Sequence, residues 1–274
     1  MSENNGQSAS DTVICTVEGG VGRLTMNRPD SLNALNPALA RDLHAAARRL
    51  AEDSRVRCIV ICGAGDHFMA GGDIRSFHAA LPALQAGDRS ALEAMFEDVH
   101  GAIRSLRGNG KPVVAEVRGA CAGFGLSLMA ACDLAWAADD CNFTLAYCHL
   151  GVSPDGGSTW SLPRTVGLKR SMELALLGDR FDAAQAREWG LVNRVLPAAE
   201  LAAQTAAVAA RLAAGPAAAY ARSKALINQS FEQDLDGQLD AERNAFIDCT
   251  CGGEFAEGVA AFLSKRRPDF RDKS

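Results

Sequence analysis

The sequence lacks the features of a membrane or secreted protein. No apolar run reaches the length of a membrane span. Residues 1–11 are polar and have no apolar segment typical of a secretory signal, so we expect them to be disordered. Paired CxxC motifs of a zinc site are also missing. These absences favour a cytoplasmic protein without a metal centre.

Positive charge is not in excess, since 33 acidic residues outnumber 28 basic ones and give a net charge of −5. Nucleic acid and anionic membranes are therefore not the expected partners. The 274 residues, 48% of them hydrophobic, are enough to bury a core without disulfides. The nine cysteines are an odd number, and several lie in apolar runs, which favours reduced, buried side chains.

Strand and helix patterns alternate in the first half of the chain. The predicted strands are 12–18, 21–27, 56–65, 111–119, 134–139 and 141–147, and the predicted helices are 36–53, 88–108 and a helix that starts at 123. Asn36 is the candidate N-cap of the first helix. The alternation predicts an α/β core with parallel strands, whose carboxyl ends hold the ligand. From residue 157 onwards the chain is mostly helical.

Three turns contain residue types suited to chemistry. In the first, Ala70, Gly71 and Gly72 allow a ligand close to the backbone, and Asp73 is the candidate cap of a following helix. The second, 118–133, also runs from a strand into small residues and an apolar helix. Two such turns can aim free N–H groups at one oxygen and form an oxyanion hole. An ordinary glycine-rich loop is the alternative for each.

The third turn, His149–Arg164, reads "HLGVSPDGGSTWSLPR" and contains a single acidic residue, Asp155. In a Pro/Gly turn before a helix, an aspartate is first interpreted as a helix cap. A catalytic carboxylate is the second interpretation.

Together the motifs resemble the crotonase (enoyl-CoA hydratase/isomerase) superfamily. The likeness runs from about Thr12 through "RLTMNRPDSLNALN", "FMAGGDI", "GACAGFGLSLMAACDLAWA", "LGVSPDGGSTWSLPRTVG" and "GVAAFLSKRRPDF". It implies a ββα spiral core over 12–200 and a C-terminal helical region over 201–274 that forms a homotrimer or hexamer. It also implies an acyl-CoA thioester as substrate, with no further cofactor.

The resemblance assigns the oxyanion donors to the backbone N–H groups of Gly72 and Phe124. Many members have glycine where Phe124 stands, so its side chain is expected to reshape the pocket. Substrate and CoA contacts are implied at Arg28, Leu32, Ala34, Ala70, Asp73, Ile74, Ala120, Gly123, Ser127, Tyr147, Pro154, Phe262 and Lys265.

The departures from the family pattern decide the expected reaction. Hydratases of the family use two glutamates, and the matching positions here are Ser127 and Tyr147. Hydration needs a base and an acid, which these hydroxyls do not supply at neutral pH. Asp155 alone can move a proton between carbons, so the hypothesis is an enoyl-CoA or ring acyl-CoA isomerase. Alternatives are a hydratase, lyase or hydrolase with non-standard residues, with Asp155 as base or nucleophile, or a non-catalytic acyl-CoA-binding protein.

Overall fold

The computed structural model describes residues 8–9 and 12–271. Its strands are β1 (Ser8–Ala9), β2 (Val13–Glu18), β3 (Val21–Met26), β4 (Cys58–Gly63), β5 (Val113–Val117), β6 (Ala120–Ala122), β7 (Leu134–Ala138), β8 (Asn142–Thr144), β9 (Phe181–Asp182) and β10 (Arg194–Leu196). Its helices are α1 (Pro37–Glu52), α2 (Ile74–Gln85), α3 (Ser90–Gly108), α4 (Phe124–Ala130), α5 (Ser158–Thr165), α6 (Gly167–Leu177), α7 (Ala183–Glu188), α8 (Ala198–Ala213), α9 (Ala217–Gln229), α10 (Leu235–Thr250) and α11 (Gly253–Leu263), with 3-10 turns η1 (Pro29–Ser31) and η2 (Tyr147–Leu150).

Within the described residues, one sheet has the strand order β1-β2-β3-β4-β5-β7-β10. Strands β3, β4, β5, β7 and β10 are parallel, whereas β1, β2 and β3 pair antiparallel. A smaller sheet has the order β6-β8-β9. The parallel centre confirms the predicted α/β class. The strand predicted to reach residue 147 ends at Thr144, and Tyr147 begins η2 instead.

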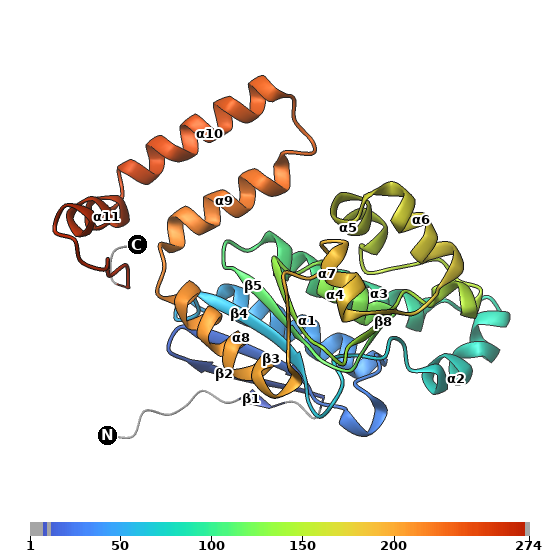
Figure 1. The fold of residues 1–274 in the computed structure, drawn as a ribbon. Coiled ribbons are helices and arrows are strands. Elements are labelled where there is room, and N and C mark those ends of the chain that lie inside the picture. Colours follow the sequence, from blue (N-terminus) through green and yellow to red (C-terminus); the bar gives the residue numbers. More distant parts are fainter. Residues whose placement is uncertain (1–7, 10–11, 272–274) are drawn as a thin grey trace.

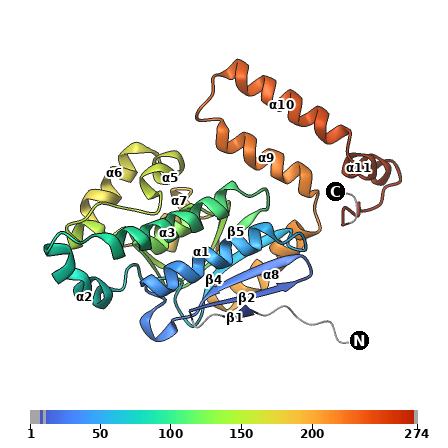
Figure 2. The same ribbon diagram turned by 180° about the vertical axis from the view of Figure 1, so that it is seen from behind.

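The large sheet is covered on both faces, with α1 and α3 on one side and α8 on the other (Figures 1 and 2). Strand β4 shows why its sequence is continuously apolar. Alternate residues of a strand point to opposite faces. Ile59 and Ile61 belong to the main core, whereas Cys58 and Val60 pack in a second cluster with Val208 of α8.

Helix α1 begins as its sequence predicts, because the Asn36 side chain accepts a hydrogen bond from the Leu39 N–H and Pro37 takes the first position. Its buried residues recur at helical spacing: Leu39, Ala40, Leu43, Ala46, Ala47 and Leu50. The cysteines fit the reduced state, since all nine are free and five are buried. No helix in residues 8–9 and 12–271 is both long and apolar enough to cross a membrane.

The C-terminal helices divide into two groups. Helix α8 packs on the sheet, so the predicted boundary at residue 201 falls inside a helix of the core. Helices α9, α10 and α11 extend away from the sheet (Figure 1). No residue of α9 or α10 is fully buried, although both helices contain large apolar side chains. Apolar surface of this kind is typical of an interface.

The N-terminal prediction needs a correction at two residues. Ser8 and Ala9 pair with Cys15 and Ile14 as the edge strand β1, so this part of 1–11 is ordered. Backbone pairing at a sheet edge does not depend on the polar composition from which disorder was predicted. The other residues of 1–11 lie outside the described residues.

The Asn33 side chain connects the loop after β3 to the loop after β4 by hydrogen bonds. Its side chain accepts from the Arg28 N–H at 2.8 Å and donates to the carbonyls of Ala64 and His67 at 3.0 and 2.8 Å. The residue is fully buried and has a positive φ of 56°, a conformation that asparagine tolerates better than most residues. These bonds hold the first glycine turn in place.

Replacing Asn33 with alanine should lower the free energy of unfolding by about 3 kcal/mol, because it leaves three backbone groups without their partner. Denaturant unfolding at a fixed protein concentration measures the change. The control is Asn142→Ala, which removes one exposed amide hydrogen bond to Asp140 and should cost about 0.5 kcal/mol or less. Equal effects for the two variants would contradict the role of Asn33.

Candidate active site

The first glycine turn is held against the loop that follows β3. The Ala70 N–H donates to the Leu32 carbonyl at 3.0 Å, and the Leu35 N–H donates to the Gly71 carbonyl at 2.7 Å. The Asp73 N–H in turn donates to the Leu35 carbonyl at 2.8 Å. This backbone ladder places the predicted contact residues of the two loops side by side.

Asp73 caps α2, as its sequence position predicts. Its Oδ1 accepts from the N–H groups of Arg75 and Ser76, and its Oδ2 pairs with the Arg28 guanidinium at 2.9 Å. Burial acts to raise the pKa of Asp73, but the Arg28 hydrogen bond and the capped N–H groups lower it below its ordinary value. Arg28 also donates to the Ala34 carbonyl, so it braces this turn from within the protein.

The second glycine turn lies directly against the first. Met69 and Cys121 form an isolated parallel bridge, with the Met69 N–H donating to the Ala120 carbonyl at 3.0 Å. At the contact itself, a Cβ added to Gly123 would lie 3.3 Å from the Gly71 Cα. Both glycines have positive φ, and their lack of side chains permits this approach.

This contact brings two free backbone donors to the same region. No backbone carbonyl of the described residues accepts from the N–H of Gly72, or from that of Phe124, the first residue of α4. The four N–H groups at the start of a helix have no partner within the helix. The Phe124 N–H is such a group, whereas Gly72 directly precedes Asp73, the N-cap of α2. Two free donors in neighbouring turns are suited to binding one partial negative charge.

The side chain of Phe124 points inward. It is 2% exposed, and a Cβ on Gly156 would lie 2.8 Å from its ring. The same Cβ would lie 2.9 Å from the Ser127 Cβ. The third turn therefore packs directly on α4. Phe124 is accommodated because residue 156 is a glycine.

Asp155 is not the cap of α5. That helix has Gly157 at its N-cap without a side-chain hydrogen bond, and the Asp155 Oδ1 accepts from the Tyr147 hydroxyl instead. Burial raises the pKa of Asp155 above its ordinary value, while the Tyr147 hydrogen bond and the charge of His100 oppose that shift. The helix-cap interpretation is thus wrong, because the N-cap position belongs to Gly157 and the carboxylate binds the Tyr147 hydroxyl of η2.

The sequence analysis did not predict His100 of α3 as a site residue. Its charge acts on Asp155, although 55 residues separate the two positions. The only available signal was its place beside the buried Val99, at the margin of the helix face that covers the core. His149 lies at the surface, where its ring contacts the Gly178 carbonyl at 3.1 Å.

Among the remaining predicted residues, Pro154 is half-buried in the third turn directly before Asp155, and the other four form two groups. Leu32 and Ile74 are 42% and 53% exposed and flank the first glycine turn, where a bound molecule can reach them. Phe262 and Lys265 lie at the end of α11, which is far from α4 in the same chain (Figure 1). This chain alone does not bring these two residues to the three turns.

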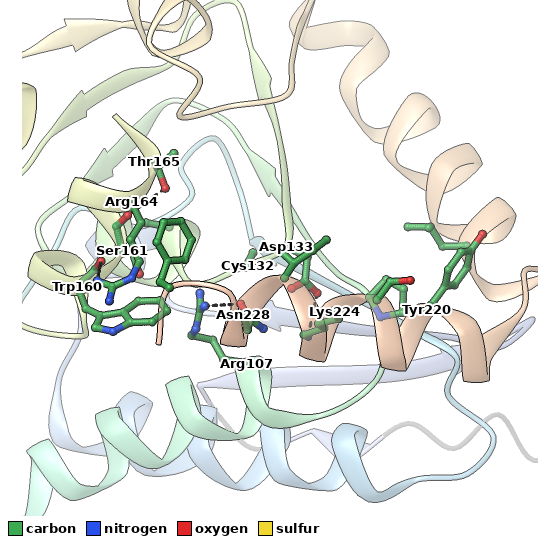
Figure 3. Close-up of a pocket in the computed structure, with 16 residues that line it drawn as sticks. Arg107, Cys132, Asp133, Trp160, Ser161, Arg164, Thr165, Tyr220, Lys224 and Asn228 are labelled. Carbon is green, nitrogen blue, oxygen red and sulfur yellow. Dashed lines mark hydrogen bonds and ion pairs between the residues drawn. The ribbon is translucent and has the colours of Figure 1, made fainter. Parts of the chain in front are cut away.

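A cavity of about 410 Å³ lies between α5, α9 and the turn after α4 (Figure 3). It adjoins the C-terminal end of α4, whereas the free donor of Phe124 is at the N-terminal end. Lys224 forms an ion pair with Asp133 at 2.8 Å. The guanidinium groups of Arg107 and Arg164 lie over the Trp160 ring, 4.5 and 4.0 Å from its centroid. No predicted site residue lines this cavity, whose walls join α9 to the core.

The three adjoining turns place two backbone N–H donors and one half-buried carboxylate close together on an α/β core. The chain belongs to the enoyl-CoA hydratase/isomerase family, whose model matches residues 16–273.

Some relatives of this chain are named isomerases and others hydratases. The chain is 36% identical over 263 residues to the 1,2-epoxyphenylacetyl-CoA isomerase of Escherichia coli K12, covering 95% of this chain and 98% of that protein. It is 33% identical over 266 residues to the crotonyl-CoA hydratase of Syntrophomonas wolfei, covering 97% and 100%. The crystal structure of an enoyl-CoA hydratase from Polaromonas sp. JS666 superposes with a TM-score of 0.85 at 36% identity, covering 94% and 98%. The crotonase fold is thereby confirmed.

The packing of the third turn makes a stability prediction with a matched control. Gly156→Ala should lower the free energy of unfolding by about 3 kcal/mol, because its Cβ overlaps the Phe124 ring. Gly157→Ala should cost about 1 kcal/mol, since the φ of Gly157 is also positive but a Cβ there would meet nothing within 4 Å. Thermal or denaturant unfolding compares them. A Gly157 effect as large as that of Gly156 would refute the contact.

Proposed function

We propose that the chain is an acyl-CoA isomerase that shifts a double bond or rearranges a ring thioester through an enolate. The thioester oxygen accepts hydrogen bonds from the N–H groups of Gly72 and Phe124, which stabilise the negative charge that develops there. Asp155 takes a proton from one carbon and returns it to another. The observation that supports this best is the position of Asp155, a partly buried carboxylate whose turn packs on the helix that begins at Phe124.

The electrostatics support an acid/base role. Burial raises the pKa of Asp155 toward the range in which a carboxylate both accepts and returns a proton. At the two positions where hydratases of the family have glutamates, Ser127 and Tyr147 contribute hydroxyl groups. A single carboxylate is sufficient for a proton shift, because the base and its conjugate acid act in sequence.

The proposed substrate is a coenzyme A thioester, and the proposed reaction needs no further cofactor. The exposed side chains of Leu32 and Ile74 would contact the bound substrate beside the first glycine turn.

The family resemblance further suggests a homotrimer or hexamer in the cytoplasm, in which Phe262 and Lys265 reach a neighbouring subunit's site. Large exposed apolar side chains support an assembly: Ile227, Leu235, Leu239, Phe246, Ile247, Phe255, Val259 and Leu263. Analytical ultracentrifugation tests it, and a monomer would contradict it.

A second candidate is hydration or hydrolysis, favoured by His100. Its charge acts on Asp155, so two titratable groups are available and one of them could activate water. Some relatives of this chain are named hydratases. The two functions differ in their need for the second group, since isomerisation uses Asp155 alone.

Asp155→Asn should reduce isomerisation of a β,γ-unsaturated hexenoyl-CoA by about 10²- to 10⁴-fold, because the base is lost. Binding of the thioester should persist, because the backbone donors are unchanged. Product formation is followed by NMR, and binding by calorimetry. The control is Asp140→Asn, an exposed carboxylate on the loop before β8, which should leave the rate unchanged. Full activity of Asp155→Asn would refute the proposal.

His100→Gln separates the two candidate functions. If Asp155 acts alone, exchange of acyl protons with deuterated water and isomerisation should stay within about threefold of the unmodified protein. If His100 activates water, addition of water to crotonyl-CoA or thioester hydrolysis should be present in the unmodified protein and fall by about 10²-fold in the variant. Absence of proton exchange with every bound thioester would favour a non-catalytic acyl-CoA-binding protein.

A further inference from the structure

Asp155, Tyr147 and Ser127 form a continuous chain of polar groups between the third turn and α4. The Tyr147 hydroxyl donates to Oδ1 of Asp155, and the Ser127 Oγ lies 3.3 Å from the Tyr147 hydroxyl. Ser127 is fully buried, and its Oγ is also 3.4 Å from the Gly123 carbonyl. The three side chains come from separate elements, so their meeting is a product of the fold.

The direction of these hydrogen bonds follows from counting protons. An ionised carboxylate only accepts, and a phenol has one proton to donate. Tyr147 therefore gives its proton to Asp155, and the single proton of Ser127 is shared between the Tyr147 oxygen and the Gly123 carbonyl. Burial, followed by the charge and hydrogen bond of Asp155, raises the pKa of Tyr147 well above its ordinary value. Tyr147 thus remains protonated wherever the carboxylate titrates.

The hydrogen bond makes the two oxygens of Asp155 unequal. Oδ1 accepts from the Tyr147 hydroxyl, Oδ2 accepts from no side chain of the described residues, and the N–H of Asp155 itself also contacts the carboxylate. Oδ2 is consequently the oxygen available to a substrate carbon. A carboxylate fixed at one oxygen also loses rotational freedom, which favours one defined approach of the base.

We propose that Tyr147 is the positioning residue of the acid/base, holding Oδ1 of Asp155 so that Oδ2 alone takes a proton from one substrate carbon and returns it to another. In the first step a C–H bond breaks and an O–H bond forms at Oδ2, while the electron pair moves onto the thioester oxygen as an enolate. In the second step the electron pair returns from the thioester oxygen, so that the C=O bond re-forms and the double bond shifts, while the O–H bond at Oδ2 breaks and a C–H bond forms at the other carbon. The inference rests on the proposed isomerase function.

The same hydrogen bond affects the pH dependence of the reaction. Four influences on Asp155 are present: burial raises its pKa, while the Tyr147 hydroxyl from η2, the charge of His100 from α3 and the N–H of Asp155 itself lower it. Removing the Tyr147 hydroxyl takes away the largest of the three opposing influences, so the pKa of Asp155 rises further. Asp155 then becomes protonated at a higher pH. As the pH is lowered, activity therefore begins to fall at a higher pH than in the unmodified protein.

The first experiment replaces Tyr147 with phenylalanine in the full chain. Turnover of β,γ-unsaturated hexenoyl-CoA should fall about 10- to 100-fold, as expected for the loss of a hydrogen bond to a charged group. The acidic limb of the pH profile should move to higher pH, while KM should change by less than about threefold. A merely structural role would raise KM or lower stability without moving the limb, and that result would overturn the inference.

Tyr220→Phe is the matched control, since Tyr147 and Tyr220 are the two tyrosines of the chain. Tyr220 lies on α9 and lines the separate cavity of Figure 3, so its hydroxyl is not part of the chain to Asp155. This variant should keep the rate and the pH profile of the unmodified protein. In an Asp155→Asn background, Tyr147→Phe should cause no additional loss, because the two residues act as one unit.

A second measurement does not depend on activity. In the Tyr220→Phe protein, Tyr147 is the remaining tyrosine, so ultraviolet titration of the phenolate reports its pKa directly, with circular dichroism showing where the protein stays folded. Its ionisation should occur above the ordinary tyrosine pKa of about 10 and move to lower pH when Asp155→Asn is added. An ordinary titration that ignores Asp155 would overturn the inference. If Tyr147 titrates as expected but Asp155→Asn retains isomerase activity, the proposed function fails instead.

Discussion

The close approach of two backbone segments underlies the whole site. Gly71 and Gly123 meet where side chains would keep the first and second turns apart, since a Cβ on Gly123 would lie 3.3 Å from the Gly71 Cα. The isolated bridge between Met69 and Cys121 holds this contact from one side. Because the N–H groups of Gly72 and Phe124 follow directly, the geometry of the proposed oxyanion site depends on backbone packing. Side-chain chemistry is therefore free to vary around it.

The third turn supplies the carboxylate of Asp155, and two opposing influences act on its protonation. Burial favours the protonated form of Asp155, whereas the Tyr147 hydroxyl favours the charged form. A carboxylate with burial alone would bind its proton tightly, and one with full solvation would be a weak base. The packing of Gly156 on Phe124 links this balance to the oxyanion site, because the same turn fixes the position of both Asp155 and the start of α4.

The sequence predicted the parts of the structure that depend on local patterns. Continuous apolar runs identified β4 and β5, and local caps identified the starts of α1 and α2 through Asn36 and Asp73. The partner of Asp155 could not be predicted in this way, because a helix cap and a hydrogen bond from Tyr147 use the same Pro/Gly turn. His100 was missed because its proximity to Asp155 depends on how α3 packs across the core.

Membership of the family does not by itself decide between isomerase and hydratase, because names of both kinds occur among similar proteins. The backbone donors serve either reaction equally, since both pass through charge on the thioester oxygen. The difference lies in the number of groups that exchange protons. Tyr147 binds Asp155, and Ser127 contacts Tyr147, so these two hydroxyls adjoin one carboxylate and add no second. The proposed isomerase function rests on that single carboxylate, whereas addition of water would need a second group such as His100.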